Sequence, residues 1–591
     1  MPRCQCGNNK TPSSCCLIKI SSKPWTGLPK KVLIKQALSD AQSLAQQGNW
    51  RLCLDICEHV ERKVKDHPQT IYLRALHAAS LGHAAKSAVL FKSIYDSQNG
   101  KLPYLLNYAN ALYQSGNRAD VLTLIEANEK AFSSDLRGLK LAVDIYTYLN
   151  QNKCAAKYIR TLIKKQPDEV VHRLALANTY HRSLDDEAAL AVLDDALRKF
   201  PNHPELLFTK ASILEIQNTD QQALDLVIDI LEQGNHSAHG YILAAKLSRK
   251  LNRMSEAYQY LDKAKQELSN SNQDTQRAYL GERLAQARLS GNYKLAYETA
   301  VAQKQGRKKS TDRDWQILEK HRACVSQFVP STRVVKEESD SSSPHLFIVG
   351  FPRCGSTLLE RLLCSNFVAS SYGESDVIPR VISSLTVNKT DEWWSLADDA
   401  WNCANQKTLS DPTYYDQSTA SVDKNLFNGL RIPFIRHLDT NAVVIRCLRD
   451  PLSIVMSNFF ANYMQYEPWQ YSVESITKFL FHVDTVWDAT VNPCDERIVT
   501  VKYEEVTQRN GIPSTLDVFL GKYWGAQRVE RGVIKQRALA FSTRTASYEQ
   551  VTKNITTTAN DEYKHYISMI PPSVKIKIAE LQEKWGYELA V

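Results

Sequence analysis

The N-terminal half of the chain repeats itself every 34 residues. Seven small or turn-forming residues recur at this interval and serve as anchors for the alignment. The anchors are Gly48, Gly82, Gly116, Asn150, Leu184, Asn218 and Asn252. Seven positions before them lie Ala41, Ala75, Ala109, Val143, Ala177, Ala211 and Ala245. Five positions after them lie Cys53, Ser87, Val121, Ala155, Ala189, Ala223 and Ala257. An eighth copy, with Gly291 and Ala296 in the corresponding places, follows a five-residue insertion.

This period predicts a helix–turn–helix unit, because a small residue on each of two helices lets them approach closely. Such pairs bury their apolar faces only by stacking on one another, so several copies form one solenoid. The pattern resembles the tetratricopeptide repeat, which implies an all-α solenoid over residues 32–310; a helical bundle is the alternative. The solenoid could bind a peptide or protein in a concave groove, act as a homodimerisation arm, or serve as a spacer.

Composition places the chain among soluble globular proteins with more than one domain. It has 591 residues, of which 43% are hydrophobic and 23% charged. No run approaches the roughly 18 apolar residues of a membrane span, and the first residues lack the apolar segment of a secretory signal. We therefore expect a cytoplasmic protein without a membrane span. The net charge of +9 is spread thinly, which favours an anionic small ligand or an acidic partner, and we expect no nucleic acid.

The remaining segments define the expected domain boundaries. Residues 1–31 contain four cysteines without the histidine pair or Cys-x-x-Cys spacing of a zinc site, so we expect a disordered tail rather than a metal site. The tail cysteines are Cys4, Cys6, Cys15 and Cys16. Residues 311–344 are rich in charge and serine and predict a linker. A second domain is then expected over residues 345–591.

The second domain predicts an α/β fold. Three apolar runs, LFIVG, NAVVIRCL and ERIVTVKYEEV, are typical of parallel strands that are buried on both faces. The segment TLLERLLCSNF after the first run has helical spacing. Strands that alternate with helices predict an open parallel sheet whose ligands bind at the carboxyl ends of the strands. Arg353, Arg449 and Tyr503 each follow the end of an expected strand.

The connection after the first strand, GFPRCGST, is laid out like a phosphate-binding loop. Gly350 and Gly355 have the spacing of such a loop, but Ser356 stands where nucleotide kinases place a lysine, and Arg353 lies inside the loop. A kinase also needs a carboxylate for Mg²⁺, and no apolar run that ends in aspartate is visible. The loop is therefore a tight turn without a ligand, a kinase site, or a site for a phosphosulfate, which needs hydrogen-bond donors but no metal.

Four segments, in this order, resemble the sulfotransferases that use 3′-phosphoadenosine-5′-phosphosulfate (PAPS). They are FIVGFPRCGSTLLE, GESDVIPR, DKNLF and VIRCLRDPLSIVMSNFF. The likeness is closest to the tyrosylprotein sulfotransferases and to the bacterial tetratricopeptide-repeat sulfotransferases, and it covers residues 345–591. It implies an enzyme with a P-loop α/β domain that moves a sulfuryl group from PAPS to a hydroxyl acceptor and has no metal.

The resemblance also assigns the residues that would bind PAPS. The 5′-phosphosulfate would lie against Arg353, Cys354, Gly355, Ser356 and Thr357. Arg449 and Ser457 would bind the 3′-phosphate, and a guanidinium group suits a terminal phosphate. Taken alone, Arg449 could instead form a buried ion pair with Asp450. Three further positions match nucleotide contacts: Tyr503, Ser547 and Lys564.

The resemblance implies that Glu374, twenty-one residues after Arg353, is the catalytic base. An acceptor hydroxyl is a poor nucleophile until a base within hydrogen-bond reach takes its proton. We expect Glu374 to be partly buried; a solvated loop residue is the alternative, and His437 is a second candidate base. Lys424, together with Arg353, would stabilise the negative charge that builds on the bridging oxygen.

Two departures from the resembled pattern affect these assignments. Cys354 replaces a serine, although backbone N–H groups dominate the loop contacts, and Asn425-Leu426 lacks the proline that the resembled segment carries after Lys424. The acceptor is open: protein tyrosine, carbohydrate and a small hydroxylated metabolite all remain. Two rival functions are a repeat-based interaction scaffold with an inactive P-loop domain and a P-loop kinase.

Overall fold

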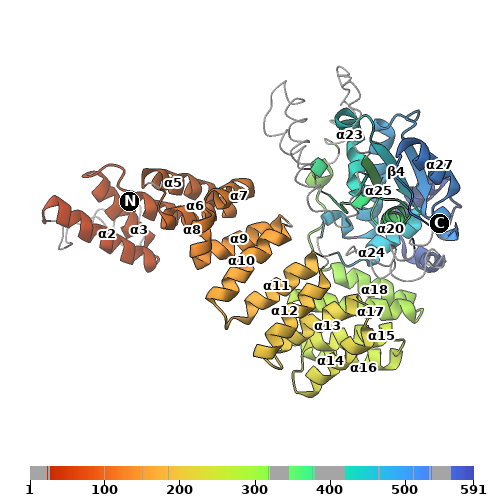
Figure 1. Ribbon diagram of the computed structural model, residues 1–591, viewed down its shortest axis with the longest axis horizontal. Coiled ribbons are helices and arrows are strands. Elements are labelled where there is room, and N and C mark those ends of the chain that lie inside the picture. The colour runs from red at the N-terminus through yellow and green to blue at the C-terminus, as the bar shows by residue number, and fades with distance from the viewer. Residues whose placement is uncertain are drawn as a thin grey trace. The chain divides into compact units, whose positions relative to one another are not determined.

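The computed structural model shows an α-helical repeat region followed by an α/β region with a five-stranded parallel sheet (Figure 1). This confirms the predicted fold class. The structure describes residues 23, 27–98, 100–149, 151–183, 185–316, 319, 345–375, 377–379, 420–463, 466–509, 511–530, 534 and 561–590. The chain forms two compact units, residues 1–213 and 214–591, and the second unit contains the last repeats together with the sheet.

Within the described residues, the helices of the repeat region follow one another in pairs. The pairs of the first unit are α2 (Lys30–Gln46) and α3 (Trp50–Glu61), α4 (Pro68–Ser80) and α5 (Ala84–Ser97), α6 (Leu102–Gln114) and α7 (Arg118–Ala127), α9 (Leu136–Tyr148) and α10 (Asn152–Lys165), and α11 (Val170–Arg182) and α12 (Asp186–Lys199). The later pairs are α13 (Pro204–Ile216) and α14 (Asp220–Glu232), α15 (Ala238–Lys250) and α16 (Met254–Gln266), and α17 (Gln273–Leu289) and α18 (Tyr293–Lys304). Two short helices, α8 (Glu129–Ser134) and η1 (Glu267–Asn270), lie between pairs.

The anchor residues that the structure describes lie in the turn between the two helices of their pair. Those with described structure have a left-handed backbone, with φ between 60° and 85°, which glycine and asparagine adopt most readily. They are Gly48, Gly82, Gly116, Asn218, Asn252 and Gly291; Asn150 and Leu184 lie outside the described residues.

The small residues on either side of the anchors are buried in the helix seams. Six of the seven positions before the anchors and all seven after them have no exposed surface, and the exception, Val143, is half-buried. In one seam the Ser87 hydroxyl donates a hydrogen bond to the carbonyl oxygen of Ala75 on the paired helix, at 2.9 Å. The 34-residue period therefore reflects close helix pairing.

The last helix pair shares its core with the α/β region. α17 and α18 contribute Leu284, Ala287, Ala296 and Ala300 to the buried cluster that also contains Leu346 and Ile348 of the first strand. The expected linker, residues 311–344, and the expected N-terminal tail lie largely outside the described residues. None of the helices in the described part of the chain is long and apolar enough to cross a membrane.

The sheet has the strand order β2-β3-β1-β4-β5, and all neighbouring strands are parallel. The strands are β1 (His345–Gly350), β2 (Ser370–Ser371), β3 (Ser421–Asp423), β4 (Val443–Leu448) and β5 (Ile498–Lys502). β4 and β5 fall within two of the predicted apolar runs, and β1 covers the third and begins one residue before it, at His345. The chain leaves β1 toward β2 and β3 on one side and then continues to β4 and β5 on the other. The carboxyl ends of β1 and β4 therefore border the topological switch point, where ligands bind in open α/β sheets.

Helices cover both faces of the sheet, so successive residues of β1 enter different buried clusters. Leu346 and Ile348 pack on one face, and Phe347 and Val349 pack on the other. The remaining helices are α20 (Ser356–Asn366), η2 (Leu426–Arg431), α23 (Ile432–Leu438), α24 (Pro451–Phe460), η3 (Pro468–Gln470), α25 (Val473–Thr490), α26 (Tyr503–Arg509), α27 (Ser514–Tyr523), η5 (Asp561–Met569) and α30 (Pro572–Trp585). Burial on both faces explains why these strands lack alternation.

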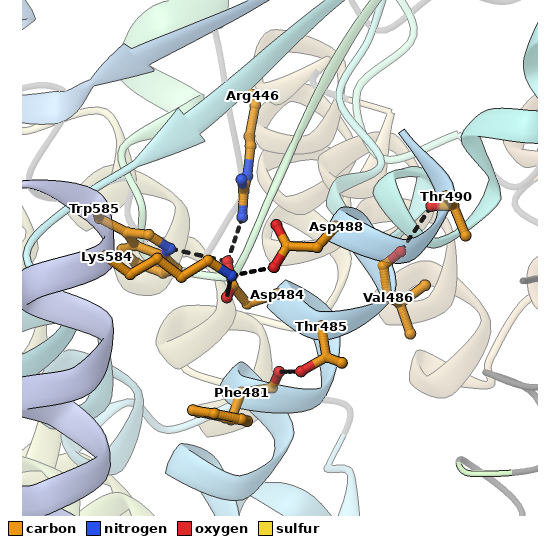
Figure 2. Close-up of polar contacts among 9 residues, drawn as sticks. All are labelled: Arg446, Phe481, Asp484, Thr485, Val486, Asp488, Thr490, Lys584 and Trp585. Carbon is orange, nitrogen blue, oxygen red and sulfur yellow. Dashed lines mark hydrogen bonds and ion pairs between the residues drawn. The ribbon is translucent and has the colours of Figure 1, made fainter. Parts of the chain in front are cut away.

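A buried polar network joins β4 to α25 and α30 (Figure 2). Arg446 of β4 donates a hydrogen bond to Asp484 Oδ1 at 2.7 Å, and the Trp585 indole N–H donates to the same oxygen at 2.9 Å. Lys584 contacts the other oxygen of Asp484 and also Asp488. The Asp484 carboxylate is thus the shared acceptor for three donors that come from two different elements.

Replacing Asp484 by leucine is expected to destabilise the fold by about 3–5 kcal/mol, because Arg446 would keep a buried charge without its carboxylate. The matched control is Asp488→Leu on the same helix, whose side chain is 50% exposed and contacts Lys584; its expected cost is below about 1 kcal/mol. Chemical unfolding of the two variants measures the difference. Equal losses would show that the network does not anchor β4.

Candidate functional site

The loop after β1 turns tightly against the neighbouring strand and against Tyr503. Arg353 and Gly355 have left-handed backbones, with φ of 74° and 98°. A Cβ atom on Gly355 would lie 2.3 Å from a ring carbon of Tyr503, and one on Gly350 would lie 2.6 Å from the Cys447 carbonyl oxygen. Both glycines are therefore required by close approach, and the loop is held over the carboxyl end of the sheet.

The loop leads directly into α20, whose N-terminus faces the same edge. Ser356 and Thr357 are its first two residues, and both side chains are buried. The backbone N–H groups of a first helical turn have no partners within the helix, so they form a ready anion site. The Cys354 side chain is buried beside Cys447 rather than directed outward. Any contact of Cys354 with a ligand would therefore come from its backbone.

The two arginines predicted to bind PAPS converge. Arg353 Nε donates a hydrogen bond to Ser457 Oγ at 2.9 Å, and Arg449 Nη1 donates to the Arg353 carbonyl oxygen at 3.2 Å. Asn458 Nδ2 also donates to the Pro352 carbonyl oxygen, at 2.8 Å. The loop after β1 and the helix after β4, α24, thus form one site, although their residues are about a hundred positions apart in sequence.

The Asp450 carboxylate makes hydrogen bonds that the alternative of an isolated Arg449–Asp450 ion pair does not predict. Asp450 caps α24 by accepting a hydrogen bond from the Ser453 backbone N–H at 2.8 Å, and it accepts another from Gln582 at 2.7 Å. The Arg449 guanidinium lies 4.7 Å from the ring centre of Tyr503. Tyr503 is therefore in contact with both Gly355 and Arg449.

Positive charge accumulates where these residues meet. Burial lowers the pKa of the Arg353 guanidinium, and the nearby Arg449 acts in the same direction. Arg449 is buried and Arg353 half-buried, and two like charges held close together at such a position favour a nearby anion. The arrangement is therefore suited to a phosphate or sulfate group.

Lys424 lies beside this loop and is only 1% exposed. Its Nζ lies 3.5 Å from Thr357 Oγ1, 3.2 Å from Glu374 Oε1 and 3.6 Å from Glu360 Oε2. Burial alone would lower the pKa of Lys424, but Glu360 and Glu374 outweigh it and raise that pKa above its ordinary value. The lysine therefore stays positively charged between the loop and the predicted base.

Glu374 follows β2 and points its carboxylate toward Lys424. Its side chain is 61% exposed, so the expectation of partial burial was wrong. The physical reason is its position on the loop that leaves the sheet edge, where only one face of the side chain meets the protein. Exposure next to a buried lysine leaves the carboxylate accessible to a second substrate.

Asn425, in the segment that lacks the expected proline, ties Lys424 to the Glu374 loop. Its side chain donates a hydrogen bond to the Ser375 carbonyl oxygen at 2.7 Å, and its backbone N–H donates to Asp423 at 2.8 Å. Burial raises the pKa of Asp423 to about 7. The segment is thus fixed by hydrogen bonds where a proline would have fixed the backbone.

The remaining predicted residues are Ser547, His437 and Lys564. Ser547 and the side chain of His437 lie outside the described residues. Lys564 lies on η5 with an exposed side chain. Among the residues that the structure describes, no three or more His, Cys, Asp or Glu side chains are placed to hold a metal ion.

Sequence reasoning missed two residues of the site. Glu360 on α20 is buried against Lys424 and accepts a hydrogen bond from Ser371; the signal was a carboxylate within the apolar helix TLLERLL. Tyr563 is buried beside Arg449 and Ser457, and it directly precedes Lys564. Its sequence context carries no local signal, because these neighbours are distant in the chain.

Comparison with known proteins finds similar sequences or structures for both regions. Residues 344–510 match the model of the sulfotransferase family. An uncharacterized protein of Aquifex aeolicus is 22% identical over 313 residues, which are 48% of this chain and 39% of that protein, so the match spans well under half of the relative. Two solved tetratricopeptide-repeat proteins are also similar: one from Parabacteroides merdae (13% identity, 42% of this chain and 97% of that one, TM-score 0.30) and the C-terminal part of one from Cytophaga hutchinsonii (15% identity, 41% and 98%, TM-score 0.33). The region that carries the convergent arginines, Glu374 and Lys424 is thus similar to sulfotransferases.

Proposed function

We propose that this protein transfers a sulfuryl group from PAPS to a hydroxyl acceptor. The match of residues 344–510 supports a sulfotransferase role in general. The observation that carries the more specific proposal is the convergence of Arg353, Arg449 and Ser457 on one site, next to the Lys424–Glu374 pair.

The residues present fit the two anionic ends of PAPS. The start of α20 and Arg353 would hold the 5′-phosphosulfate through backbone N–H groups and a guanidinium fork. Arg449 and Ser457 would hold the 3′-phosphate, and the ring of Tyr503 would lie against the adenine side. When bound, PAPS supplies an activated sulfuryl group on a phosphate leaving group.

The chain's own residues have separable tasks in the transfer. The Glu374 carboxylate, exposed beside the loop, would accept the proton of the acceptor hydroxyl. The positively charged Nζ of Lys424 lies 3.5 Å from Thr357 Oγ1 at the start of α20. At this position it would stabilise negative charge on the bridging oxygen. Glu360 keeps that lysine protonated in its buried position. A sulfuryl group carries one negative charge where a phosphoryl group carries two, so this set suits a loop without the kinase lysine.

We propose a protein tyrosine as the acceptor, on the resemblance to the tyrosylprotein enzymes, with the repeat region as the surface that presents the peptide. A carbohydrate or a small hydroxylated metabolite is the other class of acceptor. Labelling with PAPS and a mixture of cell components, followed by identification of the labelled molecules, distinguishes these classes directly.

Nucleotide binding separates this proposal from its rivals. A ligand that binds only the folded state stabilises it by about 2.7 kcal/mol at a hundredfold excess over Kd. We therefore expect 3′,5′-ADP, which has the 3′-phosphate, to raise the melting temperature clearly, whereas ATP with Mg²⁺ has little effect. Equal shifts from both ligands would favour a kinase, and no shift from either would favour an interaction scaffold.

A further inference from the structure

Tyr563 is a buried phenol at the centre of the proposed nucleotide site. It is 1% exposed, and the Ser457 side chain is close enough to its hydroxyl to contribute to lowering the pKa of Tyr563. The Arg449 guanidinium carbon lies 5.9 Å from the centre of its ring. Tyr563 therefore lies beside both residues that are proposed to bind the 3′-phosphate.

The segment that carries Tyr563 is held by the last helix pair of the repeat region, within the same compact unit. Arg288 of α17 makes two hydrogen bonds to the Glu562 carboxylate, Nε to Oε1 and Nη2 to Oε2, each 2.7 Å long. Tyr293 of α18 stacks on His565, with ring centres 4.2 Å apart and planes 8° apart. A paired, two-point carboxylate contact and a ring stack together fix both the position and the rotation of η5.

We infer that Arg288 is a positioning residue for the nucleotide site: through Glu562 it fixes Tyr563, whose buried ring and hydroxyl lie beside Arg449 and Ser457. The repeat region is thereby coupled to donor binding. This inference rests on the proposed function.

The hydrogen bonds of Ser457 explain why Tyr563 matters. The serine hydroxyl accepts a hydrogen bond from Arg353 Nε, and the Tyr563 hydroxyl beside it would restrict its rotation further. A serine hydroxyl that is held in one rotamer loses less freedom when a phosphate binds. Burial by itself raises the pKa of Tyr563, but its neighbours, Arg288 and Arg449 foremost, outweigh burial and lower that pKa. Arg288 therefore acts on Tyr563 through its positive charge as well as through the contact with Glu562.

The same helix pair also holds α24, on which Ser457 lies. Lys304 at the end of α18 is buried and donates a hydrogen bond to the carbonyl oxygen of Ala461, the residue after α24, at 3.0 Å. Tyr297 packs on Phe459 of α24, with ring centres 5.2 Å apart. The two sides of the Ser457–Tyr563 contact are therefore both braced by the last repeat.

The test measures binding of two ligands that differ in the 3′-phosphate. Arg288→Gln is expected to raise the Kd of 3′,5′-ADP about tenfold and to leave that of 5′-AMP almost unchanged. Glu562→Gln should have the same effect, and the double variant should lose no more than either single variant, because the two residues act as a unit. The matched control is Arg277→Gln on the same helix, where the arginine pairs with the exposed Asp274; binding should match that of the wild type.

Tyr563→Phe keeps the buried ring and removes only the hydroxyl, so it tests the inference even where Arg288→Gln disturbs folding. It should also weaken 3′,5′-ADP selectively. If the wild type binds 3′,5′-ADP and both variants bind it equally well, the inference is wrong while the proposed function stands. Parallel loss of 3′,5′-ADP and 5′-AMP binding would show a merely structural role. A wild type that does not bind 3′,5′-ADP would overturn the proposed function itself.

Discussion

Replacing Glu374 by glutamine is expected to lower turnover by about 10²–10⁴-fold while leaving 3′,5′-ADP binding unchanged. Glutamine has nearly the same shape as glutamate, but its amide cannot accept the proton of the acceptor hydroxyl. The exposed position of Glu374 beside Lys424 places it where an acceptor would arrive, outside the arginine pair that would bind the nucleotide. The measurement is the rate of 3′,5′-ADP release from PAPS in the presence of acceptor, with nucleotide affinity measured separately.

The control for this variant is Glu496→Gln. Glu496 is also exposed, with 75% of its side chain accessible, and it contacts Lys522 and Tyr523 rather than any residue of the site. Its turnover should equal that of the wild type. Unchanged turnover of Glu374→Gln would dismiss Glu374 as the base, and a loss of 3′,5′-ADP binding would instead assign it to donor binding.

Replacing Lys424 by methionine should cost both activity and stability. Turnover is expected to fall about 10²–10³-fold, since a preorganised positive charge at the bridging oxygen is lost. The fold should also lose about 3–5 kcal/mol, because Glu360 would remain buried without its cation. Burial raises the pKa of Glu360, so the folded state binds the proton more tightly than the unfolded state does. The variant should therefore regain stability as the pH falls.

A second substitution separates the two losses. In Lys424→Met combined with Glu360→Gln, no buried charge is left unpaired, so most of the stability should return. Turnover should stay low, because the catalytic charge is still missing. Chemical unfolding and rates of 3′,5′-ADP release on the same preparations give both quantities. Recovery of turnover along with stability would show that Lys424 has only a structural role.

The parts of the fold that sequence predicted are those with local or periodic causes. Helix pairs repeat because each pair needs small residues at fixed offsets and a left-handed turn residue, as at Gly82 and Asn218. The strands β1, β4 and β5 are apolar throughout because both of their faces are covered. The carboxyl ends of parallel strands lie at the same edge of the sheet. The sequence could therefore predict that Arg353 and Arg449, which each follow such a strand end, lie at one site.

The rest depends on long-range packing that leaves no local pattern. β2 and β3 are two and three residues long, too short for any periodicity. The Arg288–Glu562 pair joins residues 274 positions apart, and neither residue stands out in its own segment. The exposure of Glu374 is likewise decided by where the loop leaves the sheet, and only coordinates show that.

Transfer of radioactive sulfur from labelled PAPS to the components of a cell extract tests whether this site moves a sulfuryl group. With the wild-type protein, label should appear on an acceptor other than PAPS and its breakdown products. With Glu374→Gln, which should still bind 3′,5′-ADP, it should be almost absent. Tight 3′,5′-ADP binding without any labelled acceptor, or equal labelling by both proteins, would contradict sulfuryl transfer with Glu374 as the base.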